Sequence, residues 1–396
     1  MTRQTPPDPK PKLALLSRRF SKSAGGAENY AVNLAQHLVA QFDIHVFCEH
    51  SDIALAGITV HRMRRTIKRP RWLALWLFAW WSWRQTRRGY AIVHSHENTW
   101  HGNVQTVHVR PMRYNLLVAA QSPLSKALAY LKIVTSVRLL AHLLLERLRF
   151  RNDGERLVVA VAPALGELIA STFGIPPAHL RLVPPGINLP DALPSAKRPV
   201  IDQADARAAL GLAQGAWVLL LLGHNFEKKG LAAVLRSLPL LPADVVLLVV
   251  GGNAAQVDTW RARCAQQGLG QRVVFAGTLP DSTHAFAAAD CLVHATLDDM
   301  FPLVVLEAMA AKVPVVLSVA PYCLASPLVQ AAQAASMVQD PHDEKEIAHA
   351  VDALRADGLL REAQLARATG FVHDHAWPQV AAQQALIYQQ WLAAKA

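Results

Sequence analysis

Short apolar runs rich in Val, Ile and Leu alternate with helical patterns along the chain, and this alternation constrains the fold most strongly. Continuous apolar strands separated by helices are typical of parallel sheets that are covered on both faces. The strands predicted from these runs lie at 12–17, 44–48, 91–94, 104–108, 157–161, 180–183, 217–222, 244–250, 272–276, 290–294 and 313–317. The pattern therefore predicts an α/β fold built from doubly wound sheets.

A turn-rich and Pro-rich segment at 184–199 divides these strands near the midpoint of the 396 residues. This length suits two or three domains. We expect an N-terminal domain at 1–190 and a C-terminal domain at 200–375, each resembling a Rossmann domain. Ligands of open α/β sheets bind in a cleft at the carboxyl ends of the strands, so functional residues should lie in the loops that follow strands.

Charge is divided unevenly between the two halves. Residues 1–200 hold 27 Lys and Arg against 11 Asp and Glu, whereas residues 201–396 hold 13 against 18. This asymmetry directs the N-terminal half towards an anionic partner. No nucleic-acid-binding motif accompanies the basic charge, so we expect an anionic membrane surface and no nucleic acid.

Two basic regions carry this expectation. Nine Lys and Arg with no acid flank the run at 72–83, which holds five tryptophans, and this is the composition of an interfacial anchor. Burial of this run inside its domain is an equally good interpretation. Arg110 and Arg113 precede a Leu-rich region up to residue 151, in which Lys126 and Lys132 lie, and here we favour contact with a membrane or an acceptor.

Several classes of protein are disfavoured. The start of the chain lacks the apolar segment of a signal peptide, the apolar run at 72–83 is too short to span a membrane, and the four scattered cysteines suit a reducing cytosol. The chain has no Gly-x-Ser-x-Gly elbow and no GxGxxG after its first strand, which argues against a hydrolase and a nicotinamide dehydrogenase. His94, His96, Glu97 and His101 resemble a metal cluster without a full ligand set, so we expect no metal.

Three motifs follow predicted strands. Gly25 and Gly26 lie where the first strand turns into a helix, where paired glycines let backbone N–H groups approach an anion. Lys228 and Lys229 precede a glycine after the strand at 217–222, which fits a diphosphate. Asp299, and Glu307 on the following helix, come after the strand at 290–294 and could bind the hydroxyls of a sugar nucleotide.

The strings GGAE at 25–28, KKG at 228–230 and DMFPLVVLEAMA at 299–310 together resemble the retaining GT-B glycosyltransferases of family 4. The resemblance covers nearly the whole chain and is strongest to the lipopolysaccharide-core glucosyltransferases. It implies that the terminal helix at 376–396 packs back onto the N-terminal domain. It also implies that the N-terminal domain takes the acceptor and the C-terminal domain takes the nucleotide sugar.

The same resemblance implies roles for single residues. Glu307 would bind the ribose hydroxyls, and Asp299 replaces the glutamate that contacts the donor sugar. Lys228 and Lys229 would hold the diphosphate, in place of the cation that other glycosyltransferases use. Gly25 and Gly26 would border the phosphates. His108 would line the reaction centre. His294 matches a histidine beside the carboxylate loop of the family.

We therefore expect a cytoplasmic, peripheral membrane enzyme that moves a hexose from a nucleotide diphosphate sugar to a lipid-linked acceptor. The expected donor is a UDP-sugar, the expected acceptor is a lipopolysaccharide core, and no cofactor is needed. Two alternatives remain, a nucleotide-sugar 2-epimerase and a catalytically silent module that binds nucleotide sugar or membrane. Asp299 is one methylene shorter than the family's glutamate, and Met300 stands where glycine is common, so these positions bear on donor preference.

Overall fold

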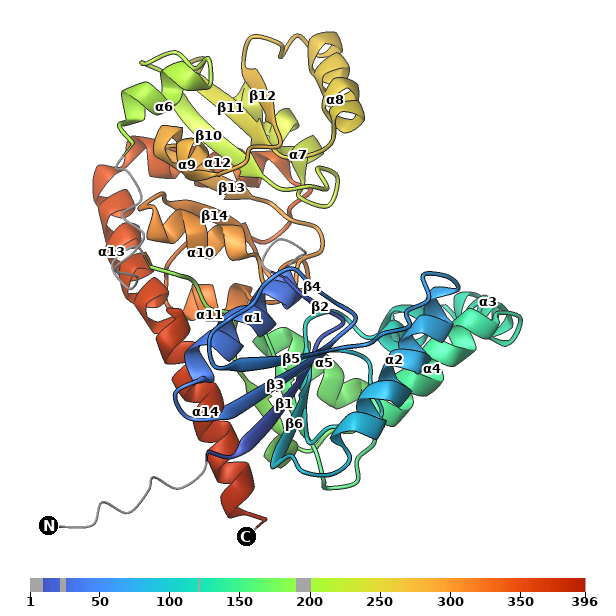
Figure 1. Cartoon of the computed structure of the whole chain (residues 1–396). Helices are drawn as coiled ribbons and strands as arrows, with labels where there is room; N and C mark the ends of the chain where they lie inside the picture. The colour runs from blue at the N-terminus through green and yellow to red at the C-terminus, as the bar shows by residue number, and fades with distance from the viewer. Residues whose placement is uncertain (1–9, 22–25, 120–121, 190–200, 396) are drawn as a thin grey trace, which may run out of the picture. The chain divides into compact units, whose positions relative to one another are not determined.

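The structure is a computed structural model that describes residues 10–21, 26–119, 122–189 and 201–395. The chain divides into two compact units (Figure 1). Unit 1 comprises Met1–Gly186 and Trp377–Ala396, and unit 2 comprises Ile187–Ala376. Of the Pro-rich segment at 184–199, residues 190–199 lie outside the described residues.

Unit 1 contains a seven-stranded parallel sheet with the strand order β5-β3-β1-β6-β7-β8-β9. Its strands are β1 (Lys12–Leu16), β3 (Asp43–Cys48), β5 (Ile58–Arg62), β6 (Ile92–Ser95), β7 (Val104–Val107), β8 (Leu157–Ala160) and β9 (Leu180–Leu182). Two short strands, β2 (Arg19–Phe20) and β4 (His50–Ser51), pair separately. The strand order reverses between β1 and β6, so the switch point of this sheet lies there.

Helices cover both faces of this sheet. They are α1 (Gly26–Leu38), α2 (Arg71–Thr86), α3 (Pro123–Val134), α4 (Val137–Arg149), α5 (Pro163–Phe173), α14 (Trp377–Ala393) and two short turns, η1 (Tyr114–Val118) and η2 (Pro177–His179). Right-handed crossovers place α1 on one face and α2 and α5 on the other. The C-terminal helix α14 packs against α1, so the end of the chain completes the first unit (Figure 1).

Unit 2 contains a six-stranded parallel sheet with the order β12-β11-β10-β13-β14-β15. Its strands are β10 (Trp217–Leu222), β11 (Val245–Val250), β12 (Val273–Gly277), β13 (Cys291–His294), β14 (Val315–Ser318) and β15 (Ser336–Val338). Numbered along the chain this order is 3-2-1-4-5-6, the Rossmann arrangement, and it reverses between β10 and β13. The crevice at the carboxyl ends of these two strands is therefore the expected place for a ligand.

The helices of unit 2 bury apolar side chains against this sheet, in which β10 and β11 are almost wholly Leu and Val. They are α6 (Gln203–Ala209), α7 (Leu231–Ser237), η4 (Leu238–Leu240), α8 (Ala254–Gln266), α9 (Thr283–Ala288), α10 (Leu303–Ala310), α11 (Ser326–Ala331), α12 (Glu344–Ala356) and α13 (Gly358–Asp374). The two units are thus both Rossmann-like α/β domains with parallel sheets, as the sequence predicts.

All eleven predicted strands are present, and two strands of the large sheets were missed. β5 has the sequence ITVHR and lies half-exposed at one edge of its sheet, and β15 has only three residues at the edge of the other. An edge strand pairs on one side only, so it needs no continuous apolar run, and the sequence signal is correspondingly weak.

Helix α2 is only partly buried. Ala74, Phe78 and Ala79 are buried, whereas Trp80 and Trp83 are 49% and 37% exposed. The tryptophan run is therefore not enclosed in the core. Burial inside the domain, one of the two interpretations open from the sequence, holds for only part of the run. Its apolar residues divide between the core face and the surface.

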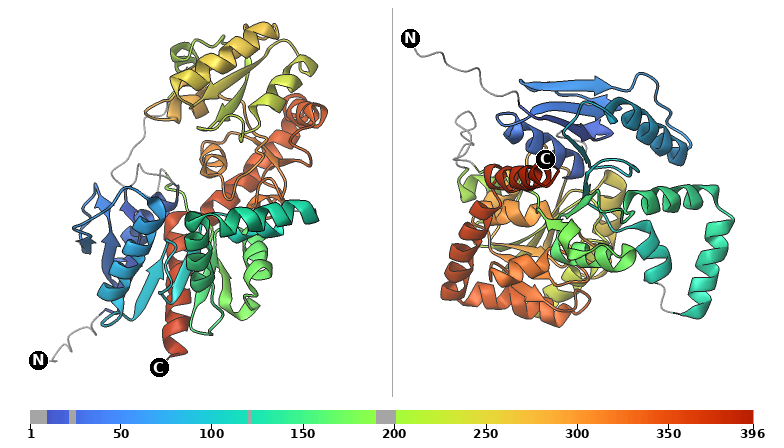
Figure 2. Two further views of the ribbon diagram at one scale, coloured as in Figure 1. Left: turned by 90° about the vertical axis from the view of Figure 1, so that its right-hand side faces the viewer. Right: turned by 90° about the horizontal axis from the view of Figure 1, so that it is seen from below.

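Helices α3 and α4 project from the sheet of their own unit, as the turquoise segments of Figure 2 show. Their outer surface exposes large apolar side chains at fractions of 44% to 71%: Leu124, Leu128, Tyr130, Leu131, Val134, Val137, Leu140 and Leu144. Among the described residues, no single helix is long and apolar enough to cross a membrane. The pair α3 and α4 meets the length and composition criteria only together, with a bend of 99° between them.

Candidate functional site

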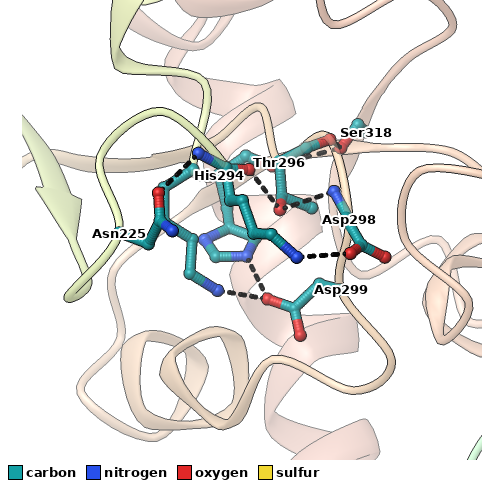
Figure 3. A network of polar contacts seen from close by, with 8 residues as sticks. Asn225, His294, Thr296, Asp298, Asp299 and Ser318 are labelled. Carbon is teal, nitrogen blue, oxygen red and sulfur yellow. Dashed lines mark hydrogen bonds and ion pairs between the residues drawn. The ribbon is translucent and has the colours of Figure 1, made fainter. Parts of the chain in front are cut away.

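The switch point of unit 2 brings together the loop after β10 and the loop after β13. Since these strands are parallel neighbours, both loops emerge at the same edge of the sheet. The first loop carries Lys228 and Lys229. The second carries Asp298 and Asp299, which Figure 3 labels. Cations and carboxylates that are 70 residues apart in the sequence thus share one crevice.

The loop after β10 is held close to the start of the loop after β13. The Lys228 carbonyl accepts hydrogen bonds from Leu297 N at 2.8 Å and from Thr296 Oγ1 at 2.9 Å. Gly230 has φ +78°, and a Cβ atom there would lie 2.0 Å from the Ala295 carbonyl oxygen. Only glycine allows this approach, so the glycine after the two lysines sets their position beside β13.

Each lysine forms an ion pair with one aspartate. Lys228 Nζ lies 2.7 Å from Asp298 Oδ2, and Lys229 Nζ pairs with Asp299 Oδ2. The same Asp299 oxygen lies 3.1 Å from His294 Nε2 (Figure 3). An ammonium group has three donors, so each lysine keeps N–H groups for an additional anion.

The pKa of Asp299 is set by competing influences. Burial alone would raise it, but the hydrogen bond from His294 and the charge of Lys229 outweigh burial and lower the pKa to about 2. Burial lowers the pKa of His294 despite the contact with Asp299. We therefore assign a neutral His294 whose Nε2–H donates to an ionised Asp299.

This assignment predicts how Asp299 contributes to stability. A carboxylate whose pKa is lowered on folding stabilises the folded state above its unfolded pKa of about 4, and this contribution is lost as the pH falls through about 2. Asp299→Asn should therefore lower the free energy of unfolding by about 2 kcal/mol at pH 7. Urea unfolding at pH 7, 4 and 2 should show the difference from wild type shrinking between pH 4 and pH 2. A difference that stays constant over this range would contradict the assignment.

Several polar residues that carry no sequence signal fix this crevice. Ser318 Oγ donates to the Thr296 carbonyl at 2.7 Å, and Asn225 Oδ1 accepts from Lys228 N at 3.1 Å (Figure 3). The backbone of Asp299 pairs with the loop after β14, since Asp299 N donates to the Tyr322 carbonyl at 2.8 Å. No sequence motif identifies these residues, because they act through main-chain contacts between loops.

Glu307 lies in the second turn of α10, directly after this loop. Its helix neighbours Val304, Val305, Leu306 and Ala308 are buried, whereas the Glu307 side chain is exposed. The carboxylate expected to bind ribose is thus at the surface of unit 2, and the helix that carries it is anchored by its apolar face.

The predicted residues of unit 1 gather at the carboxyl edge of its sheet. Gly26 begins α1, while Gly25 lies outside the described residues. His108 follows β7, and its Nε2 lies 3.1 Å from His96 Nδ1, which follows β6. The ring of the buried Tyr30 packs 5.0 Å from His108 and 5.5 Å from His96 between ring centroids.

These histidines are neutral near pH 7. Burial lowers the pKa of both His94 and His108 to about 3 and lowers that of His96 well below its usual value. His94 uses both ring nitrogens, with Tyr388 Oη at 2.5 Å and Thr106 Oγ1 at 2.6 Å. Within the described part of the chain, no three His, Cys, Asp or Glu side chains are arranged to hold a metal ion.

A buried arginine that sequence analysis did not single out supports this edge. Arg149, at the end of α4, donates to Gln105 Oε1 at 3.0 Å, Asn98 Oδ1 at 2.6 Å and the Thr106 carbonyl at 2.6 Å. Burial lowers its pKa to about 10, so it remains charged. Nothing in the Leu-rich sequence around Arg149 distinguishes it from an exposed basic residue.

The four basic residues predicted to face a membrane or acceptor occupy two places. Arg110 and Arg113 lie in the segment after β7, where Arg113 is exposed and stacks 5.9 Å from the Phe173 ring. Glu146 fixes this segment by accepting from Met112 N at 2.7 Å and from Arg113 N at 2.8 Å. Lys126 and Lys132 are exposed on α3, among its apolar side chains.

Two family models match the chain, one to each unit. Residues 24–190 match the glycosyltransferase family 4 model, and residues 202–369 match the model for glycosyl transferases group 1. A D-inositol 3-phosphate glycosyltransferase of Mycobacterium sp. (strain JLS) is 30% identical over 231 residues, which are 56% of this chain and 49% of that protein. This chain thus spans about half the length of the curated relatives it matches.

Solved structures share the fold over almost the whole chain. WaaG, a glycosyltransferase involved in lipopolysaccharide biosynthesis, matches with a TM-score of 0.75 at 16% identity, over 95% of this chain and 99% of that one. Anabaena Alr3699/HepE, solved in complex with UDP, matches with a TM-score of 0.69 at 18% identity, over 96% of this chain and 100% of that one. Together with the two family models, these matches show that the chain belongs to glycosyltransferase family 4 and has the GT-B fold.

Proposed function

We propose that this chain is a retaining hexosyltransferase that uses a nucleotide diphosphate sugar, most simply a UDP-sugar, and a lipid-linked saccharide acceptor such as a lipopolysaccharide core. In this proposal unit 2 binds the donor and unit 1 binds the acceptor at an anionic membrane surface on the cytoplasmic side. The observation that carries it is the pair Lys228 and Lys229 beside Asp299 and His294, at the switch point of a Rossmann sheet.

The lysines suit the charge that develops in the reaction. As the bond from the sugar C1 to the diphosphate oxygen breaks, its electron pair moves onto the diphosphate. Lys229 is 21% exposed and is positioned by Asp299, so its ammonium is held in place before any ligand arrives. A preorganised cation of this kind lowers the energy of the transition state because it needs no rearrangement. The lysines would do this without a metal.

The anomeric configuration is retained if the acceptor attacks C1 from the same face of the sugar that the diphosphate leaves. The acceptor oxygen forms the new bond to C1, and its proton passes to the departing phosphate oxygen. His108 would line the reaction centre as a neutral imidazole, able to donate or accept a hydrogen bond but unable to supply a fixed charge. Asp299, held ionised by His294 and Lys229, would be left to orient Lys229 and to accept from a sugar hydroxyl.

The choice of uridine rests on neighbours in fold. Alr3699/HepE, which shares the GT-B fold, was solved with UDP and with UDP-glucose. A saccharide acceptor is proposed because WaaG, which shares the fold, is involved in lipopolysaccharide biosynthesis. Incubating the protein with UDP-glucose and with rough lipopolysaccharide should give a product heavier by one hexose, with the donor's anomeric configuration in its NMR spectrum. A product with the inverted anomeric configuration would contradict the retaining mechanism. Conversion of the donor to an isomer in the absence of acceptor would instead indicate a nucleotide-sugar epimerase.

The membrane surface is proposed from helices α3 and α4. Their exposed apolar side chains are interspersed with Lys126, Lys132 and Arg138, and no Asp or Glu occurs between Glu97 and Glu146. An apolar surface surrounded by cations fits the boundary between anionic head groups and acyl chains. Helix α3 projects away from its own sheet (Figure 2), and its side chains Leu124, Leu128 and Leu131 are all more than half exposed.

Vesicle sedimentation tests the surface. Leu128→Glu with Leu131→Glu should weaken binding to anionic vesicles roughly 100-fold, because two exposed leucines lose their insertion into the acyl region. Lys126→Ala and Lys132→Ala should each weaken binding to anionic vesicles about fivefold. Neither should change binding to neutral vesicles. Leu359→Glu is the control, since Leu359 is exposed even more than Leu128 and Leu131 but lies in unit 2. Equal binding by the double variant and the control would contradict the proposed surface.

A further inference from the structure

A cavity of about 850 Å³ lies in unit 1 at the edge of the sheet opposite to the predicted site. Its walls include Ala91, Asn103 and Arg156, which immediately precede strands β6, β7 and β8. His96 and His108 follow the other ends of β6 and β7. These strands run parallel and are about 13 Å long. The cavity and the predicted reaction centre therefore lie at opposite ends of the same strands.

Four tryptophans line the cavity and come from three parts of unit 1. Trp76 and Trp83 belong to α2, Trp100 belongs to the loop before β7, and Trp391 belongs to the last turn of α14. The rings of Trp76 and Trp100 pack 5.6 Å apart between centroids, and Trp76 Nε1 donates to the Ala141 carbonyl at 3.1 Å. Indole faces are electron-rich and attract the C–H faces of sugar rings. Indoles on several walls suit a ligand of more than one ring.

The cavity also carries an excess of positive charge. Its lining contains four cations and one carboxylate, Glu155. Arg151 and Arg156 both pair with Asp153, but Arg87 and Lys395 form no ion pair with any residue that the structure describes. Arg87 instead lies 5.7 Å from the Trp83 ring, and Lys395 lies 5.2 Å from the Trp391 ring. Two cation and indole pairs thus face the same space with their charges available to an anion.

Hydrogen bonds hold the floor of the cavity in a defined conformation. Asn103 Oδ1 accepts from Val93 N at 2.7 Å, and the His101 carbonyl accepts from Gln105 Nε2 at 2.6 Å. Gly102 has φ +104°, a conformation that side chains rarely adopt. Both ring nitrogens of His101 are shielded from solvent and have no hydrogen-bond partner in the described structure. Because solvent does not reach these nitrogens, His101 contributes only the surface of its ring to the floor of the cavity.

We propose that this cavity is a second ligand site, which binds a phosphorylated saccharide. The sugar rings stack on the tryptophans, and Arg87 and Lys395 hold the phosphate. The volume is within the range of clefts that bind small molecules. The site is independent of the donor crevice, because none of its residues belongs to unit 2.

Calorimetric titration with glucose 1-phosphate and with its dodecyl phosphodiester tests the proposal. Both probes should bind, and Trp83→Ala and Arg87→Ala should each weaken binding at least tenfold. Both side chains are exposed, so these variants should fold normally. Trp80→Ala and Arg84→Ala are matched controls, because this pair has the same spacing on α2 and a similar stacking distance of 5.9 Å but does not line the cavity. Tighter binding of the dodecyl ester would identify a lipid-borne saccharide as the source, and equal binding would identify a free one.

Three results would overturn the proposal. One is the absence of saturable binding by either probe. Another is binding that Lys229→Ala abolishes and Arg87→Ala leaves unchanged, which would place the ligand in the donor crevice. The third is binding of inorganic phosphate as tight as that of glucose 1-phosphate, which would leave no role for the tryptophans. Because Lys229 and Arg87 lie in different units, failure of this site and failure of the donor site give different patterns.

Discussion

Lys229→Ala is expected to lower kcat/KM for glycosyl transfer by about 10²–10³-fold, because it removes a preorganised cation from the leaving diphosphate. The fall should appear mainly in kcat if the lysine acts on charge that develops in the transition state. Initial rates of nucleotide release in the presence of acceptor, measured over a range of donor concentrations, separate the two parameters.

Lys345→Ala is the matched control, since Lys345 is an exposed lysine of α12 in the same unit. It should retain wild-type kinetics. Activity of Lys229→Ala within severalfold of wild type would contradict the diphosphate role. So would an equal loss in the control, because that loss would reflect a general effect of charge.

Gly230→Ala is expected to disrupt the donor crevice. The added Cβ would lie 2.0 Å from the Ala295 carbonyl oxygen, and the backbone at φ +78° disfavours any side chain. Strain in the left-handed region costs about 1–3 kcal/mol, and forced displacement of the packed loops costs a similar amount. The free energy of unfolding should therefore fall by roughly 2–6 kcal/mol, and Lys228 and Lys229 should move away from Asp298 and Asp299.

Gly270→Ala provides the comparison within the same unit. A Cβ at Gly270 meets no atom within 4 Å, and its backbone is not in the left-handed region. Urea unfolding should show Gly270→Ala within about 0.5 kcal/mol of wild type. If Gly230→Ala were equally stable and active, the close contact between the loops after β10 and β13 would not be what positions the lysines.

The sequence sufficed to predict the two Rossmann-like sheets, because parallel strands buried on both faces leave continuous apolar runs. It also placed Lys228, Lys229 and Asp299 in loops that follow strands, and His294 at the end of its strand. Their pairing depends on which strands are neighbours, and β10 and β13 are separated by about 70 residues that contain β11 and β12. Strand order is a tertiary property, so the ion pairs could not be predicted from spacing.

Other features had no sequence signal at all. Arg149 lies in a Leu-rich helix whose other basic residues are exposed, and its burial depends on acceptors from Asn98, Gln105 and Thr106. The aromatic cavity likewise assembles Trp76, Trp100 and Trp391 from distant segments. The histidines at 94 and 96 suggested metal ligands because alternate residues share a face, and in the structure His94 bonds to Tyr388 and Thr106.

Calorimetric titration of UDP-, GDP- and ADP-glucose into the wild type and Glu307→Ala tests the central claim, that unit 2 binds a nucleotide sugar, most directly. Since Glu307 is exposed on a well-anchored helix, its replacement should leave the fold intact. We expect UDP-glucose to bind the wild type and to bind the variant at least tenfold more weakly. Absence of binding by all three nucleotides, or equal binding by the wild type and the variant, would contradict the account.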